Sequence, residues 1–205
     1  MKIAVIGTGY VGLVSGACFS EFGHTVTCVD KDSSKIERLL RGEIPIYEPG
    51  LDNLVTRNSD AKRLFFTTDL KTAMEGAEAV FIAVGTPSRR GDGHADLQYV
   101  FAAVEELASY IKNYTVIVTK STVPVGTGAE IKSRLKSLIS EDLFGVASNP
   151  EFLREGAAIE DFMRPDRVVV GVDNEKAQAV MTELYRPLFL NETPIIFTNR
   201  ESAEV

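Results

Sequence analysis

Three glycines with the spacing G-x-G-x-x-G constrain the fold of this chain more than any other feature of its sequence. Gly7, Gly9 and Gly12 directly follow the apolar run Lys2–Ile6. In such a strand-turn-helix unit the first glycine permits a tight turn, the second lets a pyrophosphate approach the backbone, and the third lets the helix pack closely on the strand. The N–H groups at the helix start then bind the phosphates. We therefore expect cofactor contacts from Gly7, Gly9, Tyr10, Val11 and Gly12.

An acidic residue at the end of the second apolar run supports the same interpretation. Asp30 follows Thr25–Val29, about 20 residues beyond the glycines, where a carboxylate can accept hydrogen bonds from a ribose diol. Such a charge would repel the extra phosphate of NADP, so the pattern favours NAD. Lys35 lies near enough to contact the cofactor, but it fits a solvated helix surface equally well.

Short β-branched runs alternate with helical patterns, which predicts an α/β fold: a doubly wound Rossmann-type parallel sheet with helices on both faces. The expected strands are Lys2–Ile6, Thr25–Val29, Leu64–Thr67, Ala79–Val84, Thr115–Thr119 and Gly145–Ser148, with Arg167–Val172 and Pro194–Phe197 continuing or flanking the sheet. The expected helices are Tyr10–Phe22, Ser33–Leu40, Leu70–Glu75, Asp96–Lys112, Thr127–Ile139 and Asn174–Tyr185. Gly23 is expected to end the first helix in the left-handed conformation, and Asp96 to cap the longest one.

The last residues of the chain predict the start of another helix. Thr198 and Glu201 have the spacing of a capping box, and the sequence stops at Val205. A single helical turn with nothing to pack on would not be stable. We expect residues 1–198 to form one NAD-binding Rossmann-like domain and residues 199–205 to be the start of a truncated central helix.

Charge and composition limit the partners. The formal net charge of −7 argues against nucleic acid and membrane surfaces, which are bound through an excess of Lys and Arg. The first apolar run is too short for a signal peptide, and no stretch reaches the roughly 18 apolar residues of a membrane span, so the cytoplasm is expected. Cys18 and Cys28 lie in apolar surroundings, which favours buried, reduced thiols over a disulfide or metal site. No metal is expected.

Polar residues follow the fourth and fifth expected strands. Gly85, Thr86 and Pro87 come after the fourth strand, and Ser121 and Thr122 come after the fifth. Ligands of doubly wound sheets bind beyond the carboxyl ends of the strands, so these residues are predicted to face cofactor or substrate. Each of the three hydroxyls also fits the commoner role of capping a turn.

Five stretches spread over the chain resemble the UDP-glucose/GDP-mannose dehydrogenase family, in the family's order. They are Ile6–Gly12, Pro45–Leu51, Val84–Ser88, Lys120–Thr127 and Asn149–Gly156. The last two are far more specific than the glycine motif. Enzymes of this family oxidise the C6 primary alcohol of a sugar nucleotide to a carboxylate with two NAD in succession. The resemblance therefore implies NAD as cofactor and a sugar nucleotide as substrate.

The resemblance also implies roles for individual residues. Glu151 matches the family's catalytic glutamate, which acts on the alcohol proton or the hydrolytic water, and Thr122 matches the threonine that orients this water. Without the resemblance, Glu151 fits equally well an acid stabilised by the dipole of a helix N-terminus. Substrate contacts are implied for Glu151, Phe152, Leu153, Arg154 and Glu155, of which Glu155 also lies near the cofactor. Arg154 alone also fits a surface arginine.

The triplet Pro165-Asp166-Arg167 favours the branch of the family that acts on UDP-glucose. GDP-mannose and a UDP-N-acetyl-hexosamine stay open as substrates, and an NAD-binding module without chemistry stays open as a function.

In the family a catalytic Lys follows Ala-Glu, here Ala203-Glu204, and the nucleophilic Cys comes later still. We therefore expect little or no turnover from this chain alone. The full-length enzyme is expected to be a homo-oligomer built around its central helix, and this chain a monomer.

Overall fold

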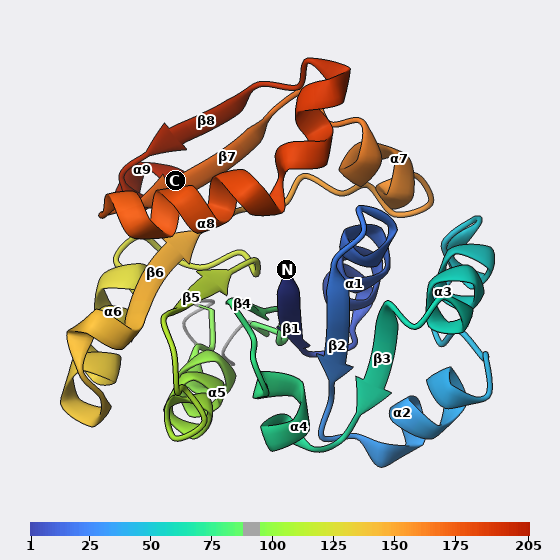
Figure 1. Cartoon of the computed structure of the whole chain (residues 1–205), viewed down its shortest axis with the longest axis horizontal. Helices are drawn as coiled ribbons and strands as arrows, with labels where there is room; N and C mark the ends of the chain where they lie inside the picture. Colours follow the sequence, from blue (N-terminus) through green and yellow to red (C-terminus); the bar gives the residue numbers. More distant parts are fainter. Residues whose placement is uncertain (88–94) are drawn as a thin grey trace.

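The computed structural model describes residues 1–87 and 95–205, which form one mixed sheet of eight strands (Figure 1). The strands are β1 (Lys2–Ile6), β2 (Thr25–Val29), β3 (Leu64–Thr67), β4 (Ala79–Ile82), β5 (Thr115–Thr119), β6 (Phe144–Ser148), β7 (Val168–Val172) and β8 (Ile195–Thr198). Their order is β3-β2-β1-β4-β5-β6-β7-β8. The first six are parallel, β7 is antiparallel to β6, and β8 is parallel to β7. The predicted fold is confirmed, and the two short strands continue the sheet.

Helices cover both faces of this sheet, each over its own hydrophobic core (Figure 1). One face carries α1 (Tyr10–Glu21), α2 (Ser33–Leu40), α3 (Leu51–Asp60), α7 (Ala158–Met163) and α8 (Glu175–Leu184). The other carries α4 (Leu70–Met74), α5 (Gln98–Ala108) and α6 (Thr127–Leu138). Two short 3₁₀ helices, η1 (Glu141–Leu143) and η2 (Arg186–Asn191), and a last turn, α9 (Arg200–Ala203), complete the described elements.

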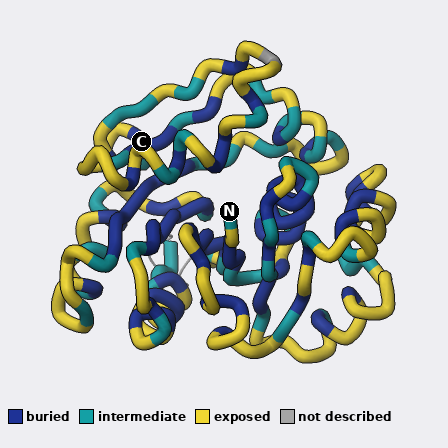
Figure 2. The backbone as a smooth tube through the Cα atoms, in the orientation of Figure 1, coloured by how far each residue is buried: buried dark blue, intermediate teal, exposed yellow. Residues whose placement is uncertain are grey.

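Strand β4 shows why several strands are apolar at consecutive positions. Ala79 and Phe81 belong to the core under α1, and Val80 and Ile82 to the core under α5. All four side chains are fully buried, and Figure 2 shows the same burial along the central strands. A parallel strand covered by helices on both faces has no wet side, so its sequence has no polar alternation.

The glycine turn has the close contacts that its spacing predicts. Gly7 has a positive φ of 102°, and a Cβ at this position would lie 2.6 Å from the carbonyl oxygen of Ala83. A Cβ at Gly12 would lie 2.0 Å from the carbonyl oxygen of Gly7. Neither position can take a side chain without moving the backbone. Gly23, with φ of 97°, follows the C-cap of α1 as predicted.

Several sequence predictions of helices were wrong or imprecise. Helices α3 and α7 were not predicted, because α3 is mostly polar and α7 has only six residues. The longest predicted helix begins at Gln98 rather than Asp96 and ends at Ala108 rather than Lys112. Asp96 lies just outside it, and its carboxylate accepts a hydrogen bond from the N–H of Gln98 at 3.0 Å.

The segment at residues 199–205 packs on the rest of the fold. The cap of α9 is Asn199, whose side chain accepts from the N–H of Ser202 at 2.7 Å, so the predicted cap at Thr198 was wrong by one residue. The turn contacts β7 and α6, and Ala203 and Arg200 are buried. The turn therefore has the packing partner that the sequence did not reveal.

The two cysteines are free and buried, as predicted. Burial raises the pKa of the Cys28 thiol to about 12. Over the described ranges, no helix is long and apolar enough to cross a membrane. Over the same ranges, no group of three or more His, Cys, Asp or Glu side chains could hold a metal ion. Ser88, the last residue of one matched stretch, lies outside the described residues.

Candidate active site

The N-terminus of α1 is open to a ligand beside Gly9. Gly9 is the N-cap residue of α1, and in the described part of the chain no side chain caps this helix. A Cβ built at Gly9 would meet no atom within 4 Å, in contrast to the crowded positions at Gly7 and Gly12. A phosphate can therefore approach the N–H groups of the first helical turn, where the helix dipole favours negative charge. The residues present fit a pyrophosphate.

Asp30 is fixed at the end of β2 by the same turn. Its Oδ2 accepts from the N–H and the hydroxyl of Thr8, both at 2.8 Å, and its Oδ1 accepts from the N–H of Asp32 at 3.0 Å. Partial burial raises the pKa of Asp30, but these hydrogen bonds outweigh it and hold the pKa below its ordinary value. The carboxylate is therefore ionised and oriented, and a carboxylate has enough lone pairs to accept further hydrogen bonds from a ribose diol.

Lys35 lies at the edge of this site. Its Nζ is 3.9 Å from Asp30 Oδ2, and 43% of its side chain is exposed. An ion pair of this length and exposure contributes little to stability. The cofactor contact predicted for Lys35 therefore stays a prediction, as does the alternative of a solvated surface lysine.

The side chain of Tyr10 is directed to a buried carboxylate. Its hydroxyl donates to Glu48, which is 7% exposed and also accepts from the N–H groups of Gly156 at 2.8 Å and Ile159 at 3.3 Å. Burial, followed by the hydrogen bond to Glu48, raises the pKa of Tyr10 to about 12, so the hydroxyl stays protonated. Glu48 thus connects α1, the matched stretch Pro45–Leu51 and the segment after β6. The sequence alone indicated no role for this residue.

Hydroxyl groups connect the loops after β4 and β5. Ser121 donates to the carbonyl oxygen of Val84 at 2.8 Å, and Thr86 donates to the carbonyl oxygen of Thr122 at 3.2 Å. These two hydroxyls therefore have the structural role that the sequence left open. Thr122 itself is exposed. The structure brings Thr122 together with the exposed residues Gly85 and Pro87 at one edge of the sheet.

Glu151 lies after β6 in a segment without regular secondary structure. The next helix, α7, begins only at Ala158, so the alternative of an acid at a helix N-terminus is wrong. The carboxylate of Glu151 accepts from the N–H of Leu153 at 2.5 Å, which orients it within the segment. The residue is only partly buried, so solvent or a ligand can reach it.

The other predicted substrate residues surround Glu151. Phe152 is exposed, Leu153 is half-buried and Glu155 is exposed. Arg154 pairs with Asp161 at 2.6 Å, while 75% of its side chain is exposed. Arg154 is thus a surface residue whose ion pair connects the segment after β6 to α7. A substrate contact through its side chain stays a prediction.

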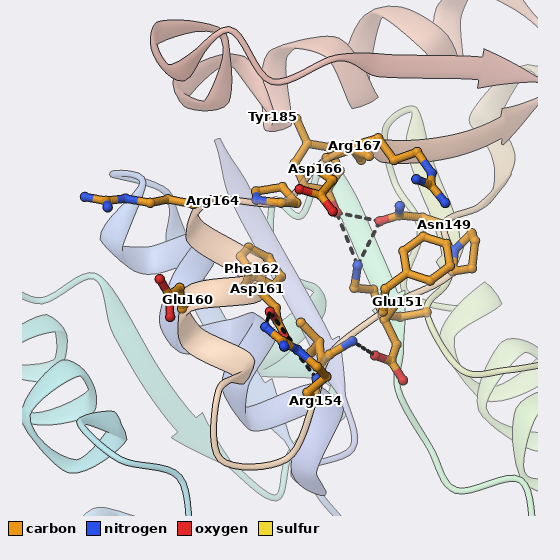
Figure 3. Close-up of a pocket in the computed structure, with 16 residues that line it drawn as sticks. Asn149, Glu151, Arg154, Glu160, Asp161, Phe162, Arg164, Asp166, Arg167 and Tyr185 are labelled. Carbon is orange, nitrogen blue, oxygen red and sulfur yellow. Dashed lines mark hydrogen bonds and ion pairs between the residues drawn. The ribbon is translucent and has the colours of Figure 1, made fainter.

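A cavity of about 530 Å³ lies between the segment after β6 and the start of β7 (Figure 3). Residues 149–154, 160–162 and 164–168 line most of it, together with two side chains from other elements, Lys120 and Tyr185. In Figure 3 the labelled Asn149 and Tyr185 point toward one another, on the side of the cavity away from the exposed Arg154. Lys120, Asn149 and Tyr185 were missed as site residues. A lysine directly after the fully buried strand β5 was the available signal.

These features define a dinucleotide-binding domain of the Rossmann type. The glycine turn, the open start of α1 and the carboxylate of Asp30 meet beyond the carboxyl ends of the strands, where the strand order reverses between β1 and β4. Residues 1–189 match the UDP-glucose/GDP-mannose dehydrogenase family, NAD binding domain. The chain belongs to this family, and its cofactor is NAD.

Curated relatives share the whole length of the chain. It is 61% identical over 207 residues to the UDP-glucose 6-dehydrogenase of Rhizobium meliloti strain 1021, covering all of this chain and 47% of that protein. It is 52% identical over 205 residues to UDP-glucose 6-dehydrogenase TuaD of Bacillus subtilis strain 168, again covering all of this chain and 44% of the relative. The chain therefore spans about half the length of these curated relatives.

Solved structures of the family have the same fold. A UDP-glucose dehydrogenase from Pyrobaculum islandicum superimposes with a TM-score of 0.92 at 39% identity, covering 98% of this chain and 47% of that one. A ternary complex of GDP-mannose dehydrogenase from Pseudomonas aeruginosa gives a TM-score of 0.93 at 37% identity, covering 100% and 48%. Fold similarity alone therefore does not separate the two sugar nucleotides.

Proposed function

We propose that this chain is the NAD-binding half of a dehydrogenase that oxidises UDP-glucose at C6 to UDP-glucuronate. The relatives that match along the full chain carry the substrate assignment, because the two cited above are both UDP-glucose 6-dehydrogenases. The triplet Pro165-Asp166-Arg167, whose residues line the cavity beside Glu151, agrees with it. Bound NAD supplies the hydride acceptor for each of the two oxidation steps.

The cofactor contacts that we propose follow from the geometry of the sheet edge. The backbone of Gly7, Gly9, Tyr10, Val11 and Gly12 faces the pyrophosphate, and Asp30 accepts hydrogen bonds from the adenosine ribose. The remaining proposed contacts are Lys35, which lies in α2, and residues of the loops after β4, β5 and β6: Gly85, Thr86, Pro87, Ser121, Thr122 and Glu155.

The catalytic roles that we propose belong to Glu151 and Thr122. Glu151 is partly buried and oriented by the N–H of Leu153, so it can take a proton from the substrate alcohol or from the hydrolytic water. The exposed hydroxyl of Thr122 can hold that water. Residues 152–154 line the cavity, and the backbone of residues 152–155 would hold the sugar nucleotide.

Two properties of the complete protein stay predictions. A cytoplasmic location agrees with the two free, buried thiols Cys18 and Cys28. A homo-oligomer is the second of these predictions.

A substrate panel tests the proposed function. The full-length dehydrogenase that we propose contains this chain should reduce NAD with UDP-glucose, measured as NADH absorbance, and turn over GDP-mannose and UDP-N-acetyl-hexosamines far more slowly. Preferential turnover of GDP-mannose would overturn the substrate assignment. If NAD binds but no sugar nucleotide is oxidised, the chain is a binding module without chemistry.

The same protein tests the role of Glu151. Glu151→Gln should lower kcat while NAD affinity stays nearly intact, because the substitution removes the proton acceptor and keeps the shape. Glu175→Gln, an exposed carboxylate on α8 that does not line the cavity, is the matched control. Unchanged turnover by Glu151→Gln would reject the role of this residue.

A further inference from the structure

A buried, charged side chain lines the cavity. Lys120 follows β5 directly, is 5% exposed, and its Nζ donates to Asn149 Oδ1 at 3.2 Å and to the hydroxyl oxygen of Tyr185 at 3.4 Å. The Tyr185 hydroxyl donates to the same Asn149 oxygen at 2.5 Å. The ring of Phe162 covers the ammonium with its centroid 5.4 Å away. Lys120, Asn149 and Tyr185 form what we name the lysine cluster.

The lysine cluster is costly for the fold. Within residues 1–87 and 95–205, both hydrogen-bond acceptors of the ammonium are neutral and no carboxylate forms an ion pair with it. A buried ammonium without such a partner destabilises the folded state. An apolar side chain of similar volume would fill this place at lower cost. Because the buried ammonium of Lys120 does not stabilise the fold, we look for its role in function.

The positions of Lys120 and Asn149 in the chain indicate that role. Lys120 is two residues before Thr122, and Asn149 is two residues before Glu151. The backbone fixes both ends of this connection, because the N–H of Lys120 donates to Ile82 in β4 at 3.1 Å and the N–H of Asn149 donates to Thr119 in β5 at 2.9 Å. The hydrogen bond between the two side chains therefore joins the segment that carries Thr122 to the segment that carries Glu151.

We propose that Lys120 is a positioning residue, whose buried ammonium, through Asn149 and Tyr185, holds the segment of Glu151 in register with the segment of Thr122. This role rests on the proposed function of these two residues in oxidising a sugar nucleotide. Lys120 acts through Asn149 and takes no proton from the substrate. A shift of about 1 Å between catalytic groups is enough to cost a large factor in rate.

The charge of Lys120 changes with pH near 8. Burial lowers the pKa of Lys120 to about 8, against which the negative charge of Glu151 and the nearby Cys18 act to raise it. Burial raises the pKa of Tyr185, so its hydroxyl stays protonated over this range. Below pH 8 the ammonium donates to both acceptors, and above pH 8 the neutral amine is a weaker donor.

Replacement of Lys120 in the full-length dehydrogenase tests the proposal. Lys120→Met should lower kcat for UDP-glucose oxidation about tenfold or more, with NAD affinity changed by less than about twofold, because the glycine turn is untouched. Lys112→Met is the matched control, because Lys112 is exposed and lies before β5, whereas Lys120 is buried and lies directly after it. The control should keep wild-type kcat.

A pH profile separates this role from a merely structural one. Wild-type kcat should fall as pH rises through about 8, the pKa of Lys120, and this alkaline limb should be absent in Lys120→Met. Asn149→Asp places a carboxylate on the ammonium, which raises the pKa of Lys120, so the limb should move to higher pH. A structural role alone predicts neither change.

The outcomes decide between the two proposals. If the wild-type enzyme turns over and Lys120→Met has the same kcat and pH profile, the role of Lys120 is wrong and the proposed function stands. If the wild-type enzyme oxidises no sugar nucleotide, both proposals are overturned. If Lys120→Met does not fold, Asn149→Asp and Tyr185→Phe decide, and an unmoved alkaline limb in both would overturn the positioning role.

Discussion

Single residues of this chain differ sharply in how well they tolerate substitution and in how their pKa values shift, because their surroundings differ. Gly9 and Gly12 belong to one motif, yet a Cβ at Gly9 meets open space and a Cβ at Gly12 meets backbone at 2.0 Å. Asp30 and Lys120 are both ionisable, but hydrogen bonds lower the pKa of Asp30 and burial lowers that of Lys120. These differences lead to separate predictions for the cofactor and for stability.

Asp30→Asn should weaken NAD binding about tenfold, or about 1.4 kcal/mol, and reduce the preference over NADP. The amide keeps the shape, but it loses the negative charge and presents a donor where the ribose needs an acceptor. Calorimetric titration of the chain with both cofactors measures this change. Asp60→Asn, an exposed acid at the end of α3, is the control. An unchanged ratio of the two affinities would show that Asp30 does not set cofactor choice.

Lys120 should make stability depend on pH in the alkaline range. Its folded-state pKa of about 8 lies below its ordinary value of 10.5, so the unfolded chain binds more protons between these values and stability rises with pH there. The gain is on the order of 2–3 kcal/mol from pH 8 to 10.5. Urea unfolding of wild type and Lys120→Met measures it as a difference between the two proteins, which cancels other titrations. A constant difference over this range would contradict the burial of the charge. Activity is expected to fall over the same range, so unfolding cannot explain that loss.

Among the elements, α6 depends on a residue far away in sequence. Its N-cap is Gly126, which has no side chain to offer. The carboxylate of Glu204 accepts instead from the N–H of Gly126 at 2.7 Å, from the N–H of Gly128 at 2.8 Å and from the hydroxyl of Ser148 at 2.8 Å. The last turn of the chain thereby fixes the start of the helix that follows the Thr122 loop.

Glu204→Ala should lower the free energy of unfolding by about 1–2 kcal/mol, as expected for loss of a helix cap that is partly buried. Urea denaturation of the chain checks the value. Glu201→Ala is the control, because Glu201 is exposed on the same turn, and it should change stability by less than about 0.5 kcal/mol. Equal stability of wild type and Glu204→Ala would mean that water replaces the cap without loss.

At the scale of the whole molecule, cofactor binding and folding are linked. A ligand that binds only the folded chain at about 100 times its Kd adds about 2.7 kcal/mol of stability. For a chain of this size that corresponds to a rise in Tm of roughly 5–10 °C.

Saturating NAD should therefore raise the Tm of the wild-type chain, and Gly9→Val should abolish this rise while leaving the Tm of the free chain nearly unchanged. The valine side chain has room in the fold but occupies the approach to the α1 N-terminus. Gly12→Val should instead unfold the chain, because its Cβ overlaps the backbone of Gly7. Differential scanning fluorimetry distinguishes these outcomes. A normal NAD-induced shift in Gly9→Val would place the pyrophosphate elsewhere.

The sequence by itself determined the local units and the class of fold. The glycine spacing, the acid at position 30 and the alternation of apolar runs with helical patterns are short-range signals, and they predicted the parallel sheet and its cofactor edge. Helix α3 was missed because its polar composition conceals the apolar spacing of Leu51, Leu54 and Val55.

Only the tertiary structure decided which distant residues share a hydrogen bond. Glu48 meets Tyr10 and Gly156, Glu204 caps α6, and Lys120 meets Tyr185. Each of these contacts joins segments that are at least 38 residues apart. No periodicity or spacing encodes such a pair, because its geometry follows from how the helices pack on the two faces of the sheet.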